Sequence, residues 1–177
     1  MHCESSTGWQ TCRRWLTALP RICRPVRRET VVTSVPDSPA AELPAAELSV
    51  QLWAGRLPRI AWFAEHCWLV ICDGDRTERW EVWQYPACGP VYWGHVHRNM
   101  MSPFGWIRDR PKYFLHQFIG EEAIGLAERI RSTPTTYPWC DRYHYVPGPN
   151  SNTYIQWCLQ DRYRLGIRAI GRGYAKW

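Results

Sequence analysis

The sequence lacks several features that would place the protein in a familiar class. It has no run of 18 or more apolar residues, so no segment is long enough to span a membrane. None of its eight cysteines forms a C-x-x-C pair, so their spacing gives no zinc-binding signature. The N-terminus has no uninterrupted apolar segment followed by a cleavage site, as a signal peptide would. We therefore expect reduced cysteines and a cytoplasmic location.

The positive charge is unevenly distributed along the chain. The net charge is +6, and residues 1–28 hold six Arg and one acid, which accounts for +5 of it. The remaining residues are therefore close to neutral, and binding to nucleic acid would require a basic face. We expect no nucleic-acid partner, and the sequence leaves the oligomeric state open.

Tryptophan is the residue type in excess, with 12 residues in a chain of 177. Each can bury a large apolar area, so we expect one domain folded around aromatic side chains. Residues 1–30 mix Arg, Cys, Ser and Pro and are predicted to be a disordered basic leader. Residues 31–48 contain a repeated Pro-Ala-Ala-Glu-Leu motif and are predicted to be a linker. The single α+β domain is then expected over residues 49–177.

The hydrophobic pattern predicts an antiparallel sheet with two main helices packed on it. Strands are expected at Val50 to Ala54, Ala61 to Cys72, Glu78 to Tyr85 and Val91 to Met101, with a further strand at 113–119. A helix is expected from Glu121 to Ser132, because apolar residues recur there at helical spacing and Pro134 would end it. A second helix is expected from the Pro-Gly-Pro segment to about Gln160.

Five sequence blocks resemble a bacterial family of unknown function, domain-of-unknown-function family 3750. They are Glu81-Val82-Trp83-Gln84, His95-Val96-His97-Arg98-Asn99, Tyr137-Pro138-Trp139, Pro147-Gly148-Pro149-Asn150-Ser151-Asn152-Thr153-Tyr154 and Ala169-Ile170-Gly171-Arg172. The resemblance covers roughly Val50 to Tyr174, and it implies a fold without implying an activity.

A second resemblance is to circularly permuted NlpC-type papain-like proteins, whose early strand histidine meets a cysteine that opens a later helix. His66 matches the early histidine, and Asn150-Ser151-Asn152-Thr153-Tyr154 resembles the later block. Ser151 stands where those enzymes have cysteine. The resemblance implies a permuted papain-like architecture and a serine-substituted or inactive amidase or acyltransferase site.

This hypothesis assigns a role to each residue of the site. Ser151 would be the nucleophile and His66 the base, with either Glu81 or Gln84 orienting the imidazole, because a serine hydroxyl needs a base to become nucleophilic. The alternative is that Asn150 or Ser151 simply caps the helix and that His66 is a satisfied core histidine. Contacts with a small-molecule, peptide or lipid substrate would come from Asn150, Asn152, Tyr145 and His144.

Two other functions stay open on the sequence. His95 and His97 would lie on one face of a strand with Asn99, a spacing that allows two imidazoles to bind one metal in a metal-dependent hydrolase. A polar sheet edge is the alternative. The missing cysteine and the tryptophan excess also fit a non-enzymatic binding or scaffold module. We expect no cofactor.

Overall fold

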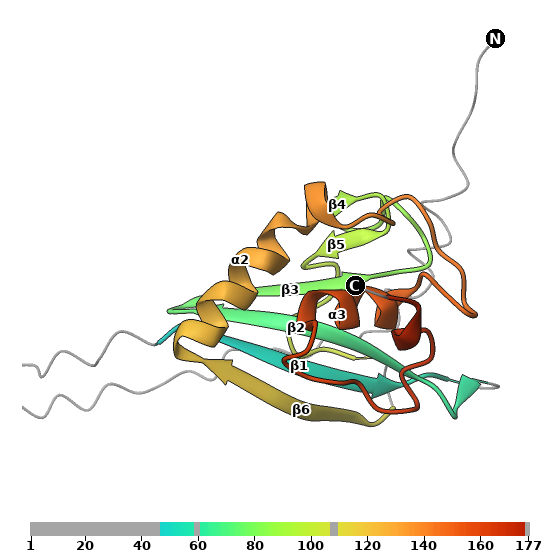
Figure 1. The fold of residues 1–177 in the computed structure, drawn as a ribbon, viewed down its shortest axis with the longest axis horizontal. Coiled ribbons are helices and arrows are strands. Elements are labelled where there is room, and N and C mark those ends of the chain that lie inside the picture. Colours follow the sequence, from blue (N-terminus) through green and yellow to red (C-terminus); the bar gives the residue numbers. More distant parts are fainter. Residues whose placement is uncertain (1–46, 59–60, 107–109, 176–177) are drawn as a thin grey trace, which may run out of the picture. The chain divides into compact units, whose positions relative to one another are not determined.

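The apolar segments pair into one antiparallel sheet. We describe a computed structural model, which places residues 47–58, 61–106 and 110–175 (Figure 1). In this part of the chain the strands are β1 (Ser49–Arg56), β2 (Glu65–Asp73), β3 (Arg76–Val82), β4 (Val91–Trp93), β5 (Val96–Arg98) and β6 (Lys112–Ile119). Their order across the sheet is β4-β5-β3-β2-β1-β6. All neighbouring pairs are antiparallel.

Side-chain alternation divides the sheet into two different faces. One face carries apolar residues of the main core, such as Leu52, Leu69 and Trp80. The other face carries residues at the alternate positions, including Trp68 and Glu81, which are also buried. The central strands are therefore covered on both faces. Because neither face contacts water, the sequence of these strands is a nearly continuous run of apolar residues.

Two helices cover the core face (Figure 1). Helix α2 (Gly120–Thr136) packs on β1 and β6, and helix α3 (Ser151–Leu159) packs on β2 and β3. A short 3₁₀ helix, η2 (Arg172–Tyr174), contacts α3 near the C-terminus. The segment that follows β5 covers the opposite face, where Trp68 Nε1 donates to the Pro103 carbonyl at 3.1 Å.

The expected α+β class, with an antiparallel sheet and two main helices, is confirmed. The permuted papain-like arrangement stays a prediction. The leader at 1–30 and nearly all of the linker lie outside the described residues. Within the described residues, no helix combines the length and the apolar character that crossing a bilayer requires.

The prediction that Pro134 ends the first helix was wrong, because α2 continues to Thr136. Proline lacks the N–H that would bond to the carbonyl four residues earlier, which here belongs to Ile130. The Thr133 hydroxyl donates to that carbonyl instead, at 2.7 Å. The acceptor that Pro134 leaves free is thus satisfied from the neighbouring residue, and the helix completes its last turn.

The continuous strand expected at Val91 to Met101 was also wrong. The segment folds as a tight hairpin of β4 and β5, with Gly94 between them at a φ of 58°. A side chain at Gly94 would bring its Cβ within 2.3 Å of the Cys140 carbonyl oxygen. Glycine is therefore required both by the backbone conformation and by the close approach of the chain at Cys140.

We predict that Thr133→Val destabilises the protein by about 1–3 kcal/mol, because the Ile130 carbonyl would remain buried without its donor. The Thr133 hydroxyl also lies 3.1 Å from the buried Tyr154 hydroxyl, which would lose the same partner. Thr135→Val is the matched control, since its hydroxyl bonds to the Ser132 carbonyl at an exposed position. Urea unfolding of both variants measures the difference, and equal losses would contradict this account.

Candidate functional site

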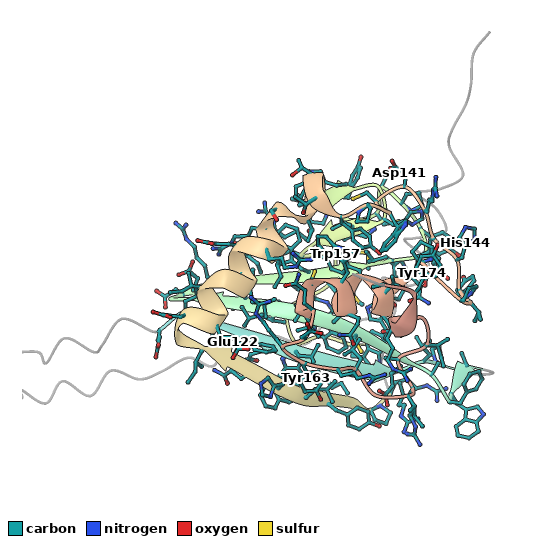
Figure 2. The ribbon with its side chains drawn as sticks, in the orientation of Figure 1. Glu122, Asp141, His144, Trp157, Tyr163 and Tyr174 are labelled. Atoms are coloured by element: carbon teal, nitrogen blue, oxygen red, sulfur yellow. The ribbon has the colours of Figure 1, made fainter. Side chains whose placement is uncertain are left out.

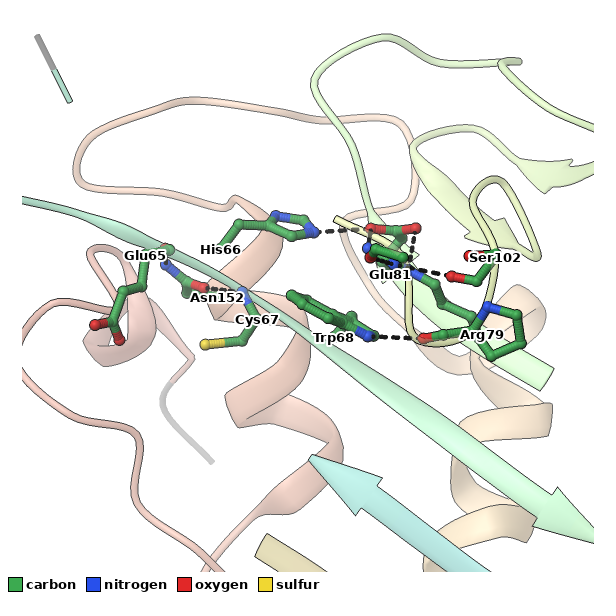
Figure 3. Close-up of polar contacts among 10 residues, drawn as sticks. Glu65, His66, Cys67, Trp68, Arg79, Glu81, Ser102 and Asn152 are labelled. Atoms are coloured by element: carbon green, nitrogen blue, oxygen red, sulfur yellow. Dashed lines mark hydrogen bonds and ion pairs between the residues drawn. The ribbon is translucent and has the colours of Figure 1, made fainter. Parts of the chain in front are cut away.

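A buried ionic group lies on the sheet face opposite the helices (Figure 3). Glu81 of β3 places Oε2 2.8 Å from Nε2 of His66 on β2, and Arg79 donates to the same oxygen at 2.8 Å. Nε of Arg79 lies 2.7 Å from the other carboxylate oxygen, Oε1. Arg79 and Glu81 have 0% exposed side chains and His66 has 3%. Burying three ionisable groups is costly unless each is paired, as they are here.

The charges in this group follow from its geometry. Burial alone would raise the pKa of Glu81, but the Arg79 charge and the bond from His66 overcome this and lower the pKa to about 2. Burial lowers the pKa of His66, although Glu81 opposes the shift. At neutral pH His66 is therefore a neutral imidazole beside an ionised carboxylate. Its Nε2–H donates to Glu81, which leaves Nδ1 with a free lone pair.

Three tryptophans surround the His66 ring. Trp106 stacks on it at 5.3 Å between ring centroids, Trp83 meets it edge-on at 5.1 Å, and Trp68 lies at 6.1 Å. Trp106 lies flat over Gly55, where a Cβ would come within 2.3 Å of the indole ring. Gly55 is the β1 partner of His66, so the missing side chain creates the space for the indole.

Arg79 also anchors the segment that covers this face. Its guanidinium lies 4.2 Å from the centre of the Trp68 ring, and its Nη1 donates to the carbonyls of Ser102 and Gly105. Asn99, at a φ of 57°, accepts from the Arg79 backbone N–H at 2.7 Å. One buried cation therefore holds both Glu81 and the segment that carries Trp106 into place.

The N-terminus of α3 is fixed by its cap. The Asn150 side chain accepts from the backbone N–H groups of Asn152 and Thr153, while the Thr153 hydroxyl accepts from the Asn150 N–H. This is a complete capping box. Gly171, at a φ of 89°, packs against the cap, and a Cβ there would come within 2.1 Å of Asn150 Nδ2. The prediction that Asn150 or Ser151 caps the helix is confirmed, and the cap is Asn150.

Asn152 connects α3 to the peptide groups on both sides of His66 (Figure 3). Its Oδ1 accepts from the Cys67 N–H at 3.1 Å, and its Nδ2 donates to the Glu65 carbonyl at 2.8 Å. Nδ2 also donates to the Ile170 carbonyl at 3.0 Å. The helix start, the start of β2 and the C-terminal segment are thus joined by one amide, which also holds Ser151, the neighbouring residue, close to β2.

Ser151 is the first residue of α3 and is buried. Its hydroxyl interacts with the phenol of Tyr143, whose pKa is raised to about 12, chiefly by burial. Within the described residues, no hydrogen bond joins Ser151 to His66. The His66 ring is bonded to Glu81, so the structure brings together the predicted base and one of its two predicted partners.

The other residues predicted to belong to the site lie away from the His66 ring. Gln84 follows the end of β3 and accepts from the Tyr145 hydroxyl, so it does not serve as the partner of His66. Tyr145 and His144 are exposed, and Figure 2 shows His144 at the outer margin of the molecule. Their predicted role in binding a ligand stays a prediction, as does that of Asn150, whose side chain is occupied by the cap.

His95 and His97 are buried and bonded to the backbone. His95 Nδ1 lies 2.8 Å from the Trp83 carbonyl, and His97 Nε2 lies 3.1 Å from the Tyr85 carbonyl. Burial lowers the pKa of His97. In the described part of the chain, no group of three or more His, Cys, Asp or Glu side chains is placed to hold a metal ion. The metal-dependent function stays a prediction.

Sequence reasoning missed Arg79 and the three tryptophans around His66. Arg79 had a detectable signal, because it alternates with Glu81 on one face of the strand while the apolar residues Trp80 and Val82 lie on the other face. A charged pair on one face of a buried strand indicates a buried ionic group. Trp106 had no such signal, since it lies in a segment without periodicity and reaches His66 only through the fold.

We predict that Glu81→Gln lowers the stability by about 3–5 kcal/mol, because Arg79 would keep its buried charge without a counterion. Glu78→Gln is the matched control on the same strand. Glu78 pairs at 3.1 Å with the exposed Arg131, and loss of this pair should cost less than about 1 kcal/mol. Denaturant unfolding of both variants tests the difference, and a small loss for Glu81→Gln would show that Arg79 tolerates an unpaired state.

We predict that stability falls as the pH is lowered from neutral. Folded His66 resists protonation, so loss of stability begins when the pH falls below 6.5, the ordinary pKa of the unfolded residue. Glu81 contributes stability that is complete above its unfolded pKa of 4.5 and is lost as the pH falls toward about 2.

Unfolding free energies measured at pH 7.5, 6, 5 and 4 test this dependence. His66→Gln should lose less stability than the parent protein between pH 7.5 and pH 5, because one proton-linked group has been removed. Parallel curves for the two proteins would show that His66 contributes nothing to the acid sensitivity.

The sequence was also compared with known proteins. The model of one family, described as Protein of unknown function (DUF3750), matches residues 47–174. No curated protein and no solved structure matches the chain. The matched region spans the whole sheet, both helices and the group formed by Arg79, Glu81 and His66. The chain therefore belongs to the DUF3750 family of proteins of unknown function.

Proposed function

We propose that the domain is a papain-like hydrolase or acyltransferase that acts on amide or ester bonds through a serine. In this proposal Ser151 is the nucleophile, His66 is the general base and Glu81 orients the imidazole. The observation that carries the proposal is the Asn152 amide, which bonds to the peptide groups on both sides of His66. It ties the start of α3 to the residue that would act as its base.

The electrostatics of His66 support the same roles. An ionised Glu81 accepts from Nε2–H, so the lone pair of Nδ1 is the one available to take a proton. Because the pKa of His66 is lowered, the base is unprotonated at neutral pH. Arg79 keeps Glu81 ionised and thereby fixes the tautomer of His66.

The proposed reaction has two steps. The Ser151 oxygen bonds to the substrate carbonyl carbon while His66 takes the hydroxyl proton, and His66 then returns that proton to the departing amine or alcohol. Water or another acceptor then attacks the acyl carbon while His66 takes its proton, and His66 returns that proton to the Ser151 oxygen as the acyl–oxygen bond breaks. The helix N-terminus favours the negative charge that develops on the carbonyl oxygen.

A binding or scaffold module is the second proposal, and one observation favours it. In the described residues no hydrogen bond joins the Ser151 hydroxyl to His66, whose ring lies on the sheet face opposite α3, and Ser151 instead interacts with the phenol of Tyr143. A serine hydroxyl without a base is a poor nucleophile. On this proposal the group of Arg79, Glu81 and His66 fixes the covering segment and takes no part in chemistry.

Covalent labelling with a fluorophosphonate probe distinguishes the two proposals. We predict that the folded protein is labelled at Ser151, that Ser151→Ala is not labelled, and that His66→Gln reacts about 100-fold more slowly. Ser132→Ala on α2 is the matched control and should react like the parent protein. Absence of labelling in a folded sample, or labelling of Ser151→Ala at the parent rate, would rule out the serine nucleophile.

A further inference from the structure

The two ends of the sheet differ in their surface chemistry. At one end β1 finishes beside the starts of β2 and β6, with Arg56 opposite Glu65 and Gly55 opposite Lys112. We call this the Arg56 end. At the other end Ser49 pairs with both Cys72 and Ile119, and we call it the Ser49 end. The register of the strands therefore assigns each adjoining loop to one end.

The most exposed large apolar side chains gather at the Arg56 end. Ile167 is 80% exposed, Val146 72%, Tyr145 67% and Trp62 64%, and these are the four highest values among the described large apolar residues. Phe63 beside Trp62 is 54% exposed. Single exposed apolar residues are normal, but such a concentration indicates a contact surface. We refer to these five residues as the loop rim.

Hydrogen bonds connect the three loops that carry the rim residues to the start of β2 and to the start of α3. The Glu65 N–H donates to the Arg168 carbonyl at 2.9 Å, next to Ile167. Asn150 Nδ2 donates to the Tyr145 carbonyl at 2.9 Å. The loops before β2, before α3 and after α3 therefore converge at this end (Figure 1), and Figure 2 shows His144 of the rim loop there. The fold therefore fixes the positions of the loops that carry the rim residues.

The two ends differ in the balance of their exposed charges. Arg110, Lys112 and Arg168 are exposed at the Arg56 end, and the nearby acid Glu65 is paired with Arg56 at 3.5 Å. The Ser49 end carries the exposed acids Asp75, Glu121 and Glu122, together with Asp73, which pairs with Arg131 at 3.2 Å. Figure 2 shows Glu122 far from the rim. In the described part of the chain, the most exposed apolar side chains and exposed cations without an ion pair thus lie together at the Arg56 end, whereas exposed acids predominate at the Ser49 end.

We propose that the loop rim is a docking surface for an anionic lipid bilayer. Aromatic and aliphatic side chains such as Trp62 and Ile167 would enter the headgroup region, where amphipathic rings are favoured. Arg110, Lys112 and Arg168 would contact the lipid phosphates, and the acidic Ser49 end would face away from the negative surface. Charge complementarity selects a bilayer over a second copy of the chain, whose rim would bring like charges together.

This proposal does not rest on the proposed catalysis. Vesicle binding and labelling of Ser151 are separate measurements, so each can fail while the other succeeds. If both succeed, the rim would present the start of α3 and His66 to material at the bilayer surface, because Asn152 joins them at this end of the sheet.

Flotation of the full-length protein with vesicles tests the rim. Vesicles of phosphatidylcholine with phosphatidylglycerol should bind the protein more strongly than phosphatidylcholine alone. The double variant Trp62→Ser with Ile167→Ser should lower the partition coefficient about tenfold or more, because two exposed apolar side chains are removed. Ile119→Ser with Ile124→Ser is the matched control at the Ser49 end, where both side chains are exposed, and it should bind like the parent protein.

The leader is identical in all variants, so its six arginines contribute equally to each measurement. Arg168→Glu should weaken binding to the anionic vesicles and reduce its dependence on salt. Equal partitioning of the rim variant and the control would overturn the proposal, as would failure of the parent protein to float. A dimer in vesicle-free solution that the rim double variant converts to a monomer would assign the surface to a second copy and would also overturn it.

Discussion

The structure depends above all on the carboxylate of Glu81, which is buried between a guanidinium and an imidazole. Without it, Arg79 would carry an uncompensated charge in the interior, and the carbonyls of Ser102 and Gly105 would remain bonded to a side chain with no fixed position. The same carboxylate fixes the tautomer of His66. One ionised group therefore stabilises the covering segment and orients the imidazole, so a single substitution of Glu81 would alter both.

A second constraint joins the two faces of the sheet. Helix α3 packs on the core face, whereas the His66 ring lies on the opposite face, among tryptophans. Asn152 of α3 connects the helix to β2. Its side-chain amide makes the two hydrogen bonds, to the Cys67 N–H and the Glu65 carbonyl, that a neighbouring strand would otherwise make at this edge of β2. Because the ladder between β2 and β3 begins only at Leu69, the start of β2 is free to take this bond. The divergence of the two strands thus creates the place where the start of α3 bonds to the backbone of β2 on both sides of His66.

The errors of sequence reasoning have specific physical causes. Pro134 appeared to end a helix because the freed carbonyl of Ile130 was assumed to lack a donor, and the Thr133 hydroxyl supplies one. Val91 to Met101 appeared to be one strand because alternation continues through Gly94, although the positive φ of Gly94 reverses the chain. In both cases a single hydrogen bond or backbone angle decided the local structure, whereas the sequence pattern depends on several residues together.

The sequence by itself determined the α+β class, the approximate positions of the main strands and helices, and a helix cap at Asn150 or Ser151. These depend on periodicity and on local chemistry, which neighbouring residues encode. Only the tertiary structure decided that Glu81 rather than Gln84 meets His66, that Arg79 joins them and that Trp106 covers the ring. Contacts between residues far apart in the chain depend on strand register and on how a covering segment packs, and neither has a local signature.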